Sequence, residues 1–155
     1  MKRLMKGSVL IAAIGLGVSS VVLADDEKAN GVRNCTVATL DGLYVFAASG
    51  FIIPASGPAQ PKAILEWIRF NGDGTVFVAG ATRSLNGVVA QIPGGGGGSY
   101  TVTDLVPPDG GCAGTLTFAP LTFDLFIQSK GEEKIWIIQT NPNNVFQGTA
   151  TRVAR

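Results

Sequence analysis

The sequence of 155 residues contains no histidine. This absence excludes Ser-His-Asp and Cys-His catalysis, histidine-ligated metal sites and an imidazole acid–base group. Two cysteines are too few for a four-thiolate zinc site, so we expect neither a metal nor a cofactor. Charged residues make up only 15% of the chain and the formal net charge is +1, so charge gives no reason to expect a nucleic-acid partner.

Residues 1–24 have the pattern of a secretory signal peptide. Basic residues open the segment, an uncharged run extends from Gly7 to Ala24, and Val22 and Ala24 place small residues before a cleavage point. An uncleaved membrane anchor is the alternative, because the run can just cross a bilayer, but its glycines and serines favour cleavage. We therefore expect a slightly acidic mature chain in the periplasm or outside the cell, with no stable membrane span.

The two cysteines, Cys35 and Cys112, both lie in the part of the chain that is exported. An oxidising compartment and an even count predict that they pair, leaving no free thiol. In the chain-entropy model a loop of this length is worth about 4 kcal/mol. The alternative is a reactive thiol, which lacks a histidine to activate it.

The mature chain divides into a polar, aperiodic lead-in over residues 25–39, predicted to be flexible, and a single domain over residues 40–155. Short runs rich in Val, Ile, Thr, Phe and Tyr recur in the domain, separated by Gly, Asn, Asp and Pro, and no helical period appears. This spacing predicts an all-β antiparallel fold, either a small antiparallel barrel of about eight or nine strands or a β-sandwich. The expected strands are Leu43–Ala48, Ala63–Phe70, Thr75–Thr82, Gly87–Ile92, Ser99–Val106, Gly114–Phe118, Thr122–Ser129, Lys134–Thr140 and Val145–Val153.

The glycine run from Gly94 to Gly98 lies between two of these strands. A phosphate-binding loop needs a Gly-Lys-Ser/Thr sequence and a helix after the glycines, and here a strand follows. The run therefore predicts a flexible hairpin loop, which can act as a lid over a barrel mouth.

Two strands are apolar on both faces. In Ala63–Phe70, Ile64 and Ile68 share one face with Phe70, while Leu65 and Trp67 share the other. The run Lys134–Thr140 has the same property. Such strands are covered on both sides or present one face to a ligand or partner.

Six segments of the chain carry a recurring pattern of strand starts, turns and a cysteine pair: Cys35, Leu40-Asp41-Gly42-Leu43-Tyr44-Val45-Phe46, Phe70-Asn71-Gly72-Asp73-Gly74-Thr75-Val76, Gly98-Ser99-Tyr100-Thr101-Val102, Cys112-Ala113-Gly114-Thr115-Leu116 and Gly148-Thr149-Ala150-Thr151-Arg152. Together they resemble a group of small, largely uncharacterised exported bacterial proteins. The resemblance implies a barrel of the calycin or allene-oxide-cyclase type, and its motifs are turns, strand starts and a cysteine pair, which specify a fold and no catalytic residue. The sequence departs from the group at Pro107–Gly111, an insertion directly before the second cysteine.

Four aromatic residues are candidates to line a ligand cavity, with an aromatic core or barrel plug as the alternative. Three carboxylates within predicted strands, Glu66, Asp104 and Asp124, are candidates for an acid–base pair if two of them enter one pocket, although each is expected to face outward. The aromatic candidates are Tyr44, Trp67, Tyr100 and Trp136.

These features predict a soluble exported barrel whose leading function is to bind a small apolar ligand inside the barrel. One alternative is a surface or matrix interaction module that makes contact through its tryptophan faces. The other alternative is a cyclase-like or isomerase-like enzyme that acts through the shape of its cavity.

Overall fold

The computed structural model describes residues 35–105, 111–128 and 134–155. The predicted signal peptide and most of the predicted lead-in lie outside these residues. The described chain holds one short 3₁₀ helix and eight strands. They are η1 Val37–Thr39, β1 Asp41–Ile52, β2 Gln60–Asn71, β3 Thr75–Leu85, β4 Val88–Asp104, β5 Cys112–Phe118, β6 Leu121–Ile127, β7 Lys134–Gln139 and β8 Asn144–Ala154.

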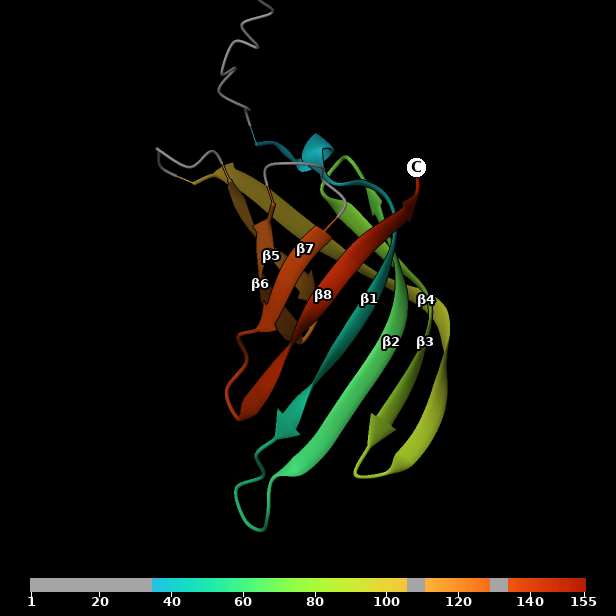
Figure 1. Ribbon diagram of the computed structural model, residues 1–155, viewed down its shortest axis with the longest axis vertical. Helices are drawn as coiled ribbons and strands as arrows, with labels where there is room; N and C mark the ends of the chain where they lie inside the picture. The colour runs from blue at the N-terminus through green and yellow to red at the C-terminus, as the bar shows by residue number, and fades with distance from the viewer. Residues whose placement is uncertain (1–34, 106–110, 129–133) are drawn as a thin grey trace, which may run out of the picture. The chain divides into compact units, whose positions relative to one another are not determined.

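The eight strands form one closed antiparallel barrel in sequence order, with β8 returning to pair with β1 (Figure 1). The prediction of an all-β barrel is confirmed, and the sandwich is wrong. Closure depends on a close approach between these two strands, because a Cβ on Gly148 would overlap the backbone of Ala47 and Ala48. The β1–β2 and β3–β4 hairpins extend past the ends of β5, β6 and β7 at one end of the barrel (Figure 1).

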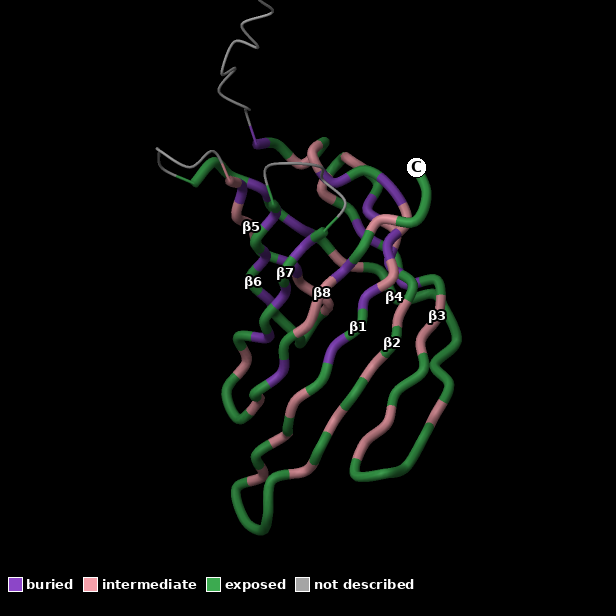
Figure 2. Tube along the Cα trace, in the orientation of Figure 1, coloured by how far each residue is buried: buried purple, intermediate pink, exposed green. Residues whose placement is uncertain are grey.

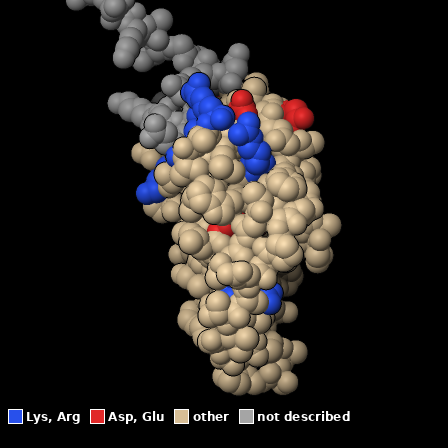
Figure 3. Space-filling view, turned by 90° about the vertical axis from the view of Figure 1, so that its right-hand side faces the viewer, with Lys and Arg blue, Asp and Glu red and all other residues tan. Residues whose placement is uncertain are grey.

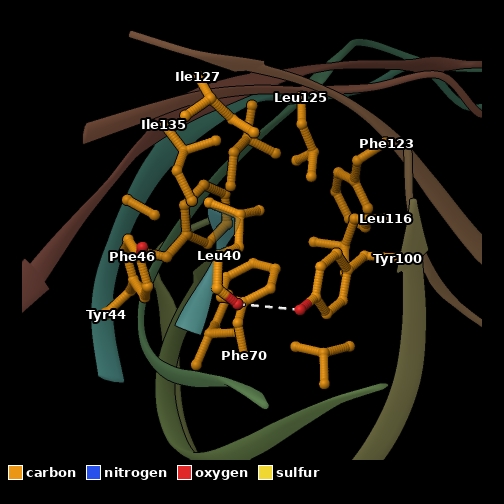
Figure 4. Close-up of a cluster of buried hydrophobic side chains, with 14 of the residues drawn as sticks. Leu40, Tyr44, Phe46, Phe70, Tyr100, Leu116, Phe123, Leu125, Ile127 and Ile135 are labelled. Carbon is orange, nitrogen blue, oxygen red and sulfur yellow. Dashed lines mark hydrogen bonds between the residues drawn. The ribbon is translucent and has the colours of Figure 1, made fainter. Parts of the chain in front are cut away.

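The packed core lies at the opposite end, where buried residues dominate the trace (Figure 2). Alternation along each strand sends every second side chain inward, and the inward residues there are large and apolar. The rings of Tyr44 and Phe70 meet edge-on at 5.2 Å between centroids, and those of Phe70 and Tyr100 do so at 5.0 Å (Figure 4). Such T-shaped pairs add to the stabilisation from burial.

The segment before β1 covers this end of the barrel and is fixed at two points. The Tyr100 hydroxyl donates toward the carbonyl oxygens of Val37 and Leu40, at 2.8 and 2.9 Å. A disulfide joins Cys35 to Cys112 at the start of β5, with 5.7 Å between the Cα atoms, which confirms the predicted pairing. The last residues of the predicted flexible lead-in therefore form a half-buried cap with a 3₁₀ turn, held by tertiary contacts that local composition does not reveal.

The glycine run is the main correction to the strand prediction. Gly94–Gly98 is not a hairpin loop or lid, because residues Val88 to Ile92 before it and Ser99 to Asp104 after it belong to one continuous strand, β4. Within this strand Gly96 to Gly98 pair with β3. Glycine is required at position 98, because a Cβ there would overlap the Thr117 carbonyl oxygen and the Phe118 ring. The barrel therefore has eight strands, not nine.

Strand β4 is paired unevenly along its length. Its second half, from Ser99 to Asp104, pairs with β5, whereas Val88 to Gly98 pair with β3 alone within the described residues. Ser99, opposite Thr75 and Thr117, is the residue where the two pairings meet. The predicted strand ends at Val106 and Ser129 lie outside the described residues. No helix in the described part of the chain is long and apolar enough to cross a membrane.

Replacing both cysteines by serine tests what the disulfide contributes. The bond joins residues separated by 77 positions. Its loss is expected to lower the free energy of unfolding by about 4 kcal/mol, because the unfolded chain regains the entropy of an open loop. Urea denaturation of the wild type with and without reductant, beside the C35S/C112S variant, measures the effect. Equal midpoints in all three samples would contradict it.

Candidate functional site

The inner face of β2 carries two charged residues among apolar ones. Ile68 points into the barrel, and the strict alternation of β2 places Ile64, Glu66 and Lys62 on the same face. A carboxylate at the centre of an inward face differs from the outward position expected from sequence. The signal was present, because Glu66 lies midway between the two isoleucines that had been assigned to one face.

These side chains line an interior cavity of about 270 Å³ at the end of the barrel away from the disulfide. Its walls come from every strand, so it is a property of the closed barrel and not of one hairpin. The lining is mostly apolar, with three charged residues. The lining residues are Phe46, Lys62, Ile64, Glu66, Ile68, Val78, Arg83, Ile92, Pro93, Gly96, Leu116, Phe118, Leu121, Phe123, Ile137 and Phe146.

The three charged residues all lie on two adjacent strands. Lys62 pairs with Leu85, near the tip of the β3–β4 hairpin, Arg83 pairs with Ile64 one step further in, and Glu66 lies deeper. The order from the mouth inward is therefore lysine, arginine, glutamate. The walls supplied by β1, β4, β5, β6, β7 and β8 contribute uncharged lining residues.

Lys62 is held at the mouth by neighbours on β7 and β8. Its Nζ atom lies 3.4 Å from Oε1 of Gln139 and 4.1 Å from the centre of the Phe146 ring. Gln139 is itself buried and donates to Oδ1 of Asn141 at 3.1 Å, which fixes the amide that faces the lysine. Burial lowers the pKa of the Lys62 ammonium, the charge of Arg83 lowers it further, and Glu66 opposes both.

Glu66 lies deeper and has no hydrogen bond or ion pair with any other described residue. Burial raises the pKa of its carboxyl to about 7, and the nearby Lys62 ammonium opposes that shift. At neutral pH the group is therefore present in both protonation states. Its protonated form can donate a hydrogen bond into the cavity, and its ionised form can accept one.

The other two candidate carboxylates do not reach the cavity. Asp104 is exposed at the opposite end, where its Oδ1 accepts a hydrogen bond of 2.7 Å from the backbone N–H of Cys35. Asp124 is exposed on the outer face of β6. A pair of carboxylates sharing one pocket is thus not formed, and Glu66 is the one acidic side chain among the lining residues.

The four aromatic candidates fall in two separate places. Tyr44 and Tyr100 are buried in the packed end, where Tyr44 accepts hydrogen bonds from Arg152 at 2.7 and 3.0 Å. Trp67 and Trp136 are on the outer surface, 46% and 54% exposed. None of the four lines the interior cavity, so the aromatic residues were a poor guide to it.

The outer surface has an apolar groove of its own, of about 980 Å³. Small residues of β1 and β8, such as Ala47 and Gly148, form its floor, and Leu65, Phe126 and Trp136 stand around it. The side of the barrel seen in Figure 3 has its charged side chains mostly toward one end, with few over the rest.

Comparison with models of known families, with curated proteins and with solved structures finds no match. Within residues 35–105, 111–128 and 134–155, no group of three or more Cys, Asp or Glu side chains is arranged to hold a metal ion. The candidate site is therefore defined by its own geometry: an apolar cavity with two cations and one carboxyl on a single wall.

The raised pKa of Glu66 predicts a pH-dependent stability. Since the pKa is about 7 in the folded protein and 4.5 ordinarily, this group stabilises the fold most below pH 4.5 and loses that contribution as pH rises through 7. Glu66→Gln removes the ionisation and is expected to make the protein more stable than the wild type at pH 8, by about 2 kcal/mol after allowance for partial solvent access. Urea midpoints between pH 5 and 8 measure this.

Asp124→Asn, on the outer face, is the matched control and is expected to leave the pH profile unchanged. A Glu66→Gln variant with the same pH profile as the wild type would show that the carboxyl is fully solvated.

Proposed function

We propose that this protein is an exported barrel that binds one small, largely apolar ligand inside the barrel. The interior cavity carries the proposal, because eight-stranded barrels are wide enough either to be filled by side chains or to hold one small ligand. Apolar cavities of about 150 Å³ bind benzene in other proteins. A cavity of about 270 Å³ therefore suits a compound of one or two rings or a short branched chain.

Export is part of the same proposal. A disulfide between Cys35 and Cys112 is typical of chains that fold in an oxidising compartment, such as the periplasm or the extracellular space. The signal-like pattern of residues 1–24 supports the same location. The resemblance to small exported barrel proteins of the calycin type agrees with both and stays a prediction.

A neutral fluorescent probe tests binding in the cavity. N-phenyl-1-naphthylamine, which fluoresces in apolar surroundings, is expected to bind with a stoichiometry of one, measured by titration and native mass spectrometry. Ile92→Trp places a larger side chain in the cavity lining and is expected to weaken binding about tenfold or more, a loss of about 1.4 kcal/mol.

Val89→Trp is the matched control, since Val89 lies three residues away on the same strand and lines the outer groove. Equal binding by the two variants would place the probe outside the barrel. No saturable binding to the wild type would contradict the proposed function.

The outer groove favours a second candidate function, an interaction module. Monomeric proteins rarely expose large continuous apolar patches, and such patches usually mark contacts with other molecules. Leu65 and Phe126 are 53% and 49% exposed, and Trp67 and Trp136 lie on the same outer surface with β1 and β8 between their strands. In this function the barrel is a scaffold that presents its outer face to a second protein chain.

Replacing both tryptophans by serine tests the second candidate. If the outer face makes the contact, the wild type is expected to sediment as an oligomer at micromolar concentration and the W67S/W136S variant as a monomer. Thr101→Ser, which keeps the hydroxyl on another exposed strand position, serves as the control. A wild type that stays monomeric, or an unchanged distribution in the double variant, counts against a contact between copies through this face.

A further inference from the structure

The cavity has two positively charged lining residues and one acidic one, although its walls are mostly apolar. Lys62 and Arg83 both line it, and Glu66 is the one acidic group there. Arg83 has no hydrogen bond or ion pair with another described residue. Lys62 has a long hydrogen bond of 3.4 Å to Gln139 and a cation–π contact with the Phe146 ring, and neither partner is charged. Lys62 is half-buried, and a charge in such a site is costly unless it meets an opposite charge or serves a ligand. Arg83 is exposed to solvent and adds its charge beside Lys62 at the mouth.

We propose that the ligand is an organic anion, with an apolar body in the cavity and an anionic group between Lys62 and Arg83 at the mouth. The proposal rests on the proposed function, because it names the class of ligand for the same cavity. The anion would accept hydrogen bonds from an ammonium and a guanidinium on neighbouring strands, and a guanidinium can bind a planar oxyanion through two N–H groups.

The positions of the charges match such a ligand. The two cations are nearest the mouth, where an anionic group keeps part of its hydration, and the apolar side chains of Phe46, Ile68 and Leu116 lie around the rest of the cavity. The cavity volume of about 270 Å³ suits a single small molecule and is too small for the two chains of a membrane phospholipid. The occupant is thus a free small anion.

Glu66 fits this arrangement because of its protonation. Its carboxyl has a pKa of about 7, so its neutral form is readily available near neutral pH. A nearby anion favours that neutral form further, and the protonated carboxyl can then donate a hydrogen bond to the ligand. The charged groups that face the cavity in the described chain all come from β2 and β3, and they are Lys62, Glu66 and Arg83. The lining residues of the other six strands are uncharged.

Two probes that share one skeleton test the proposal. 8-Anilinonaphthalene-1-sulfonate carries a permanent anionic group, and N-phenyl-1-naphthylamine lacks it. The wild type is expected to bind the anionic probe about tenfold more tightly than the neutral one. Lys62→Gln and Arg83→Gln are each expected to lower that ratio several-fold, because each removes a cation that only the anionic probe can use.

Matched variants separate a cavity effect from an effect of net charge. Lys62→Arg keeps the cation and is expected to keep the ratio. Lys134→Gln removes an exposed cation from β7, beside the outward-facing Trp136 ring, and is also expected to keep it. Between pH 6 and 8 the affinity for the anionic probe is expected to fall in the wild type as Glu66 ionises, and not in Glu66→Gln.

The outcomes distinguish the two proposals. If the neutral probe binds and the anionic probe binds no better, the anion proposal is overturned and the proposed function stands. The same holds if Lys62→Gln and Arg83→Gln both keep the wild-type ratio of the two affinities. If neither probe binds in the cavity, both are overturned. Circular dichroism of each variant confirms that the barrel is folded, so that lost binding is not lost structure.

Discussion

The pairing of β1 with β8 is the constraint on which the rest of this structure depends. Once the sheet is closed, alternate residues of every strand must enter a space whose width is set by the number of strands. At one end that space is filled by aromatic rings and closed by the disulfide-linked cap. At the other end, where the β1–β2 and β3–β4 hairpins extend past β5, β6 and β7, the same interior holds the cavity. The packed core and the candidate site therefore come from one interior.

Much of the fold follows from short-range patterns in the sequence. Alternating apolar residues, turn sequences and an even cysteine count were enough to predict an antiparallel all-β fold, either a barrel or a sandwich, and the Cys35–Cys112 bond. The structure confirms the barrel and the bond. The continuity of β4 could not be predicted in this way. Gly96 to Gly98 are held in the strand because they pair with Val76 to Val78, and the Phe118 ring packs against Gly98. These contacts join distant parts of the chain.

The candidate site was harder to predict, because aromatic residues drew attention away from charged ones. Tyr44 and Tyr100 use their hydroxyl groups to hold the N-terminal cap and Arg152, and the two tryptophans face outward. Glu66 could be placed inside from the alternation of β2 alone. Arg83 could not, because the register of β3 shifts opposite Trp67 and Ile68, and a shift of one residue reverses which side chains face inward.

The one-sided pairing of β4 also bears on whether its open edge can pair with another chain. A strand with an open edge presents N–H and C=O groups that another chain can pair with, which is the usual route to aggregation. Here Pro93 removes one donor from that edge, and the β3–β4 register is irregular between Val78 and Gly80, directly opposite. The positive φ of Gly95 turns the backbone further from a regular strand. The same glycines and proline that let β4 line the cavity thus make its open edge a poor template for a ninth strand.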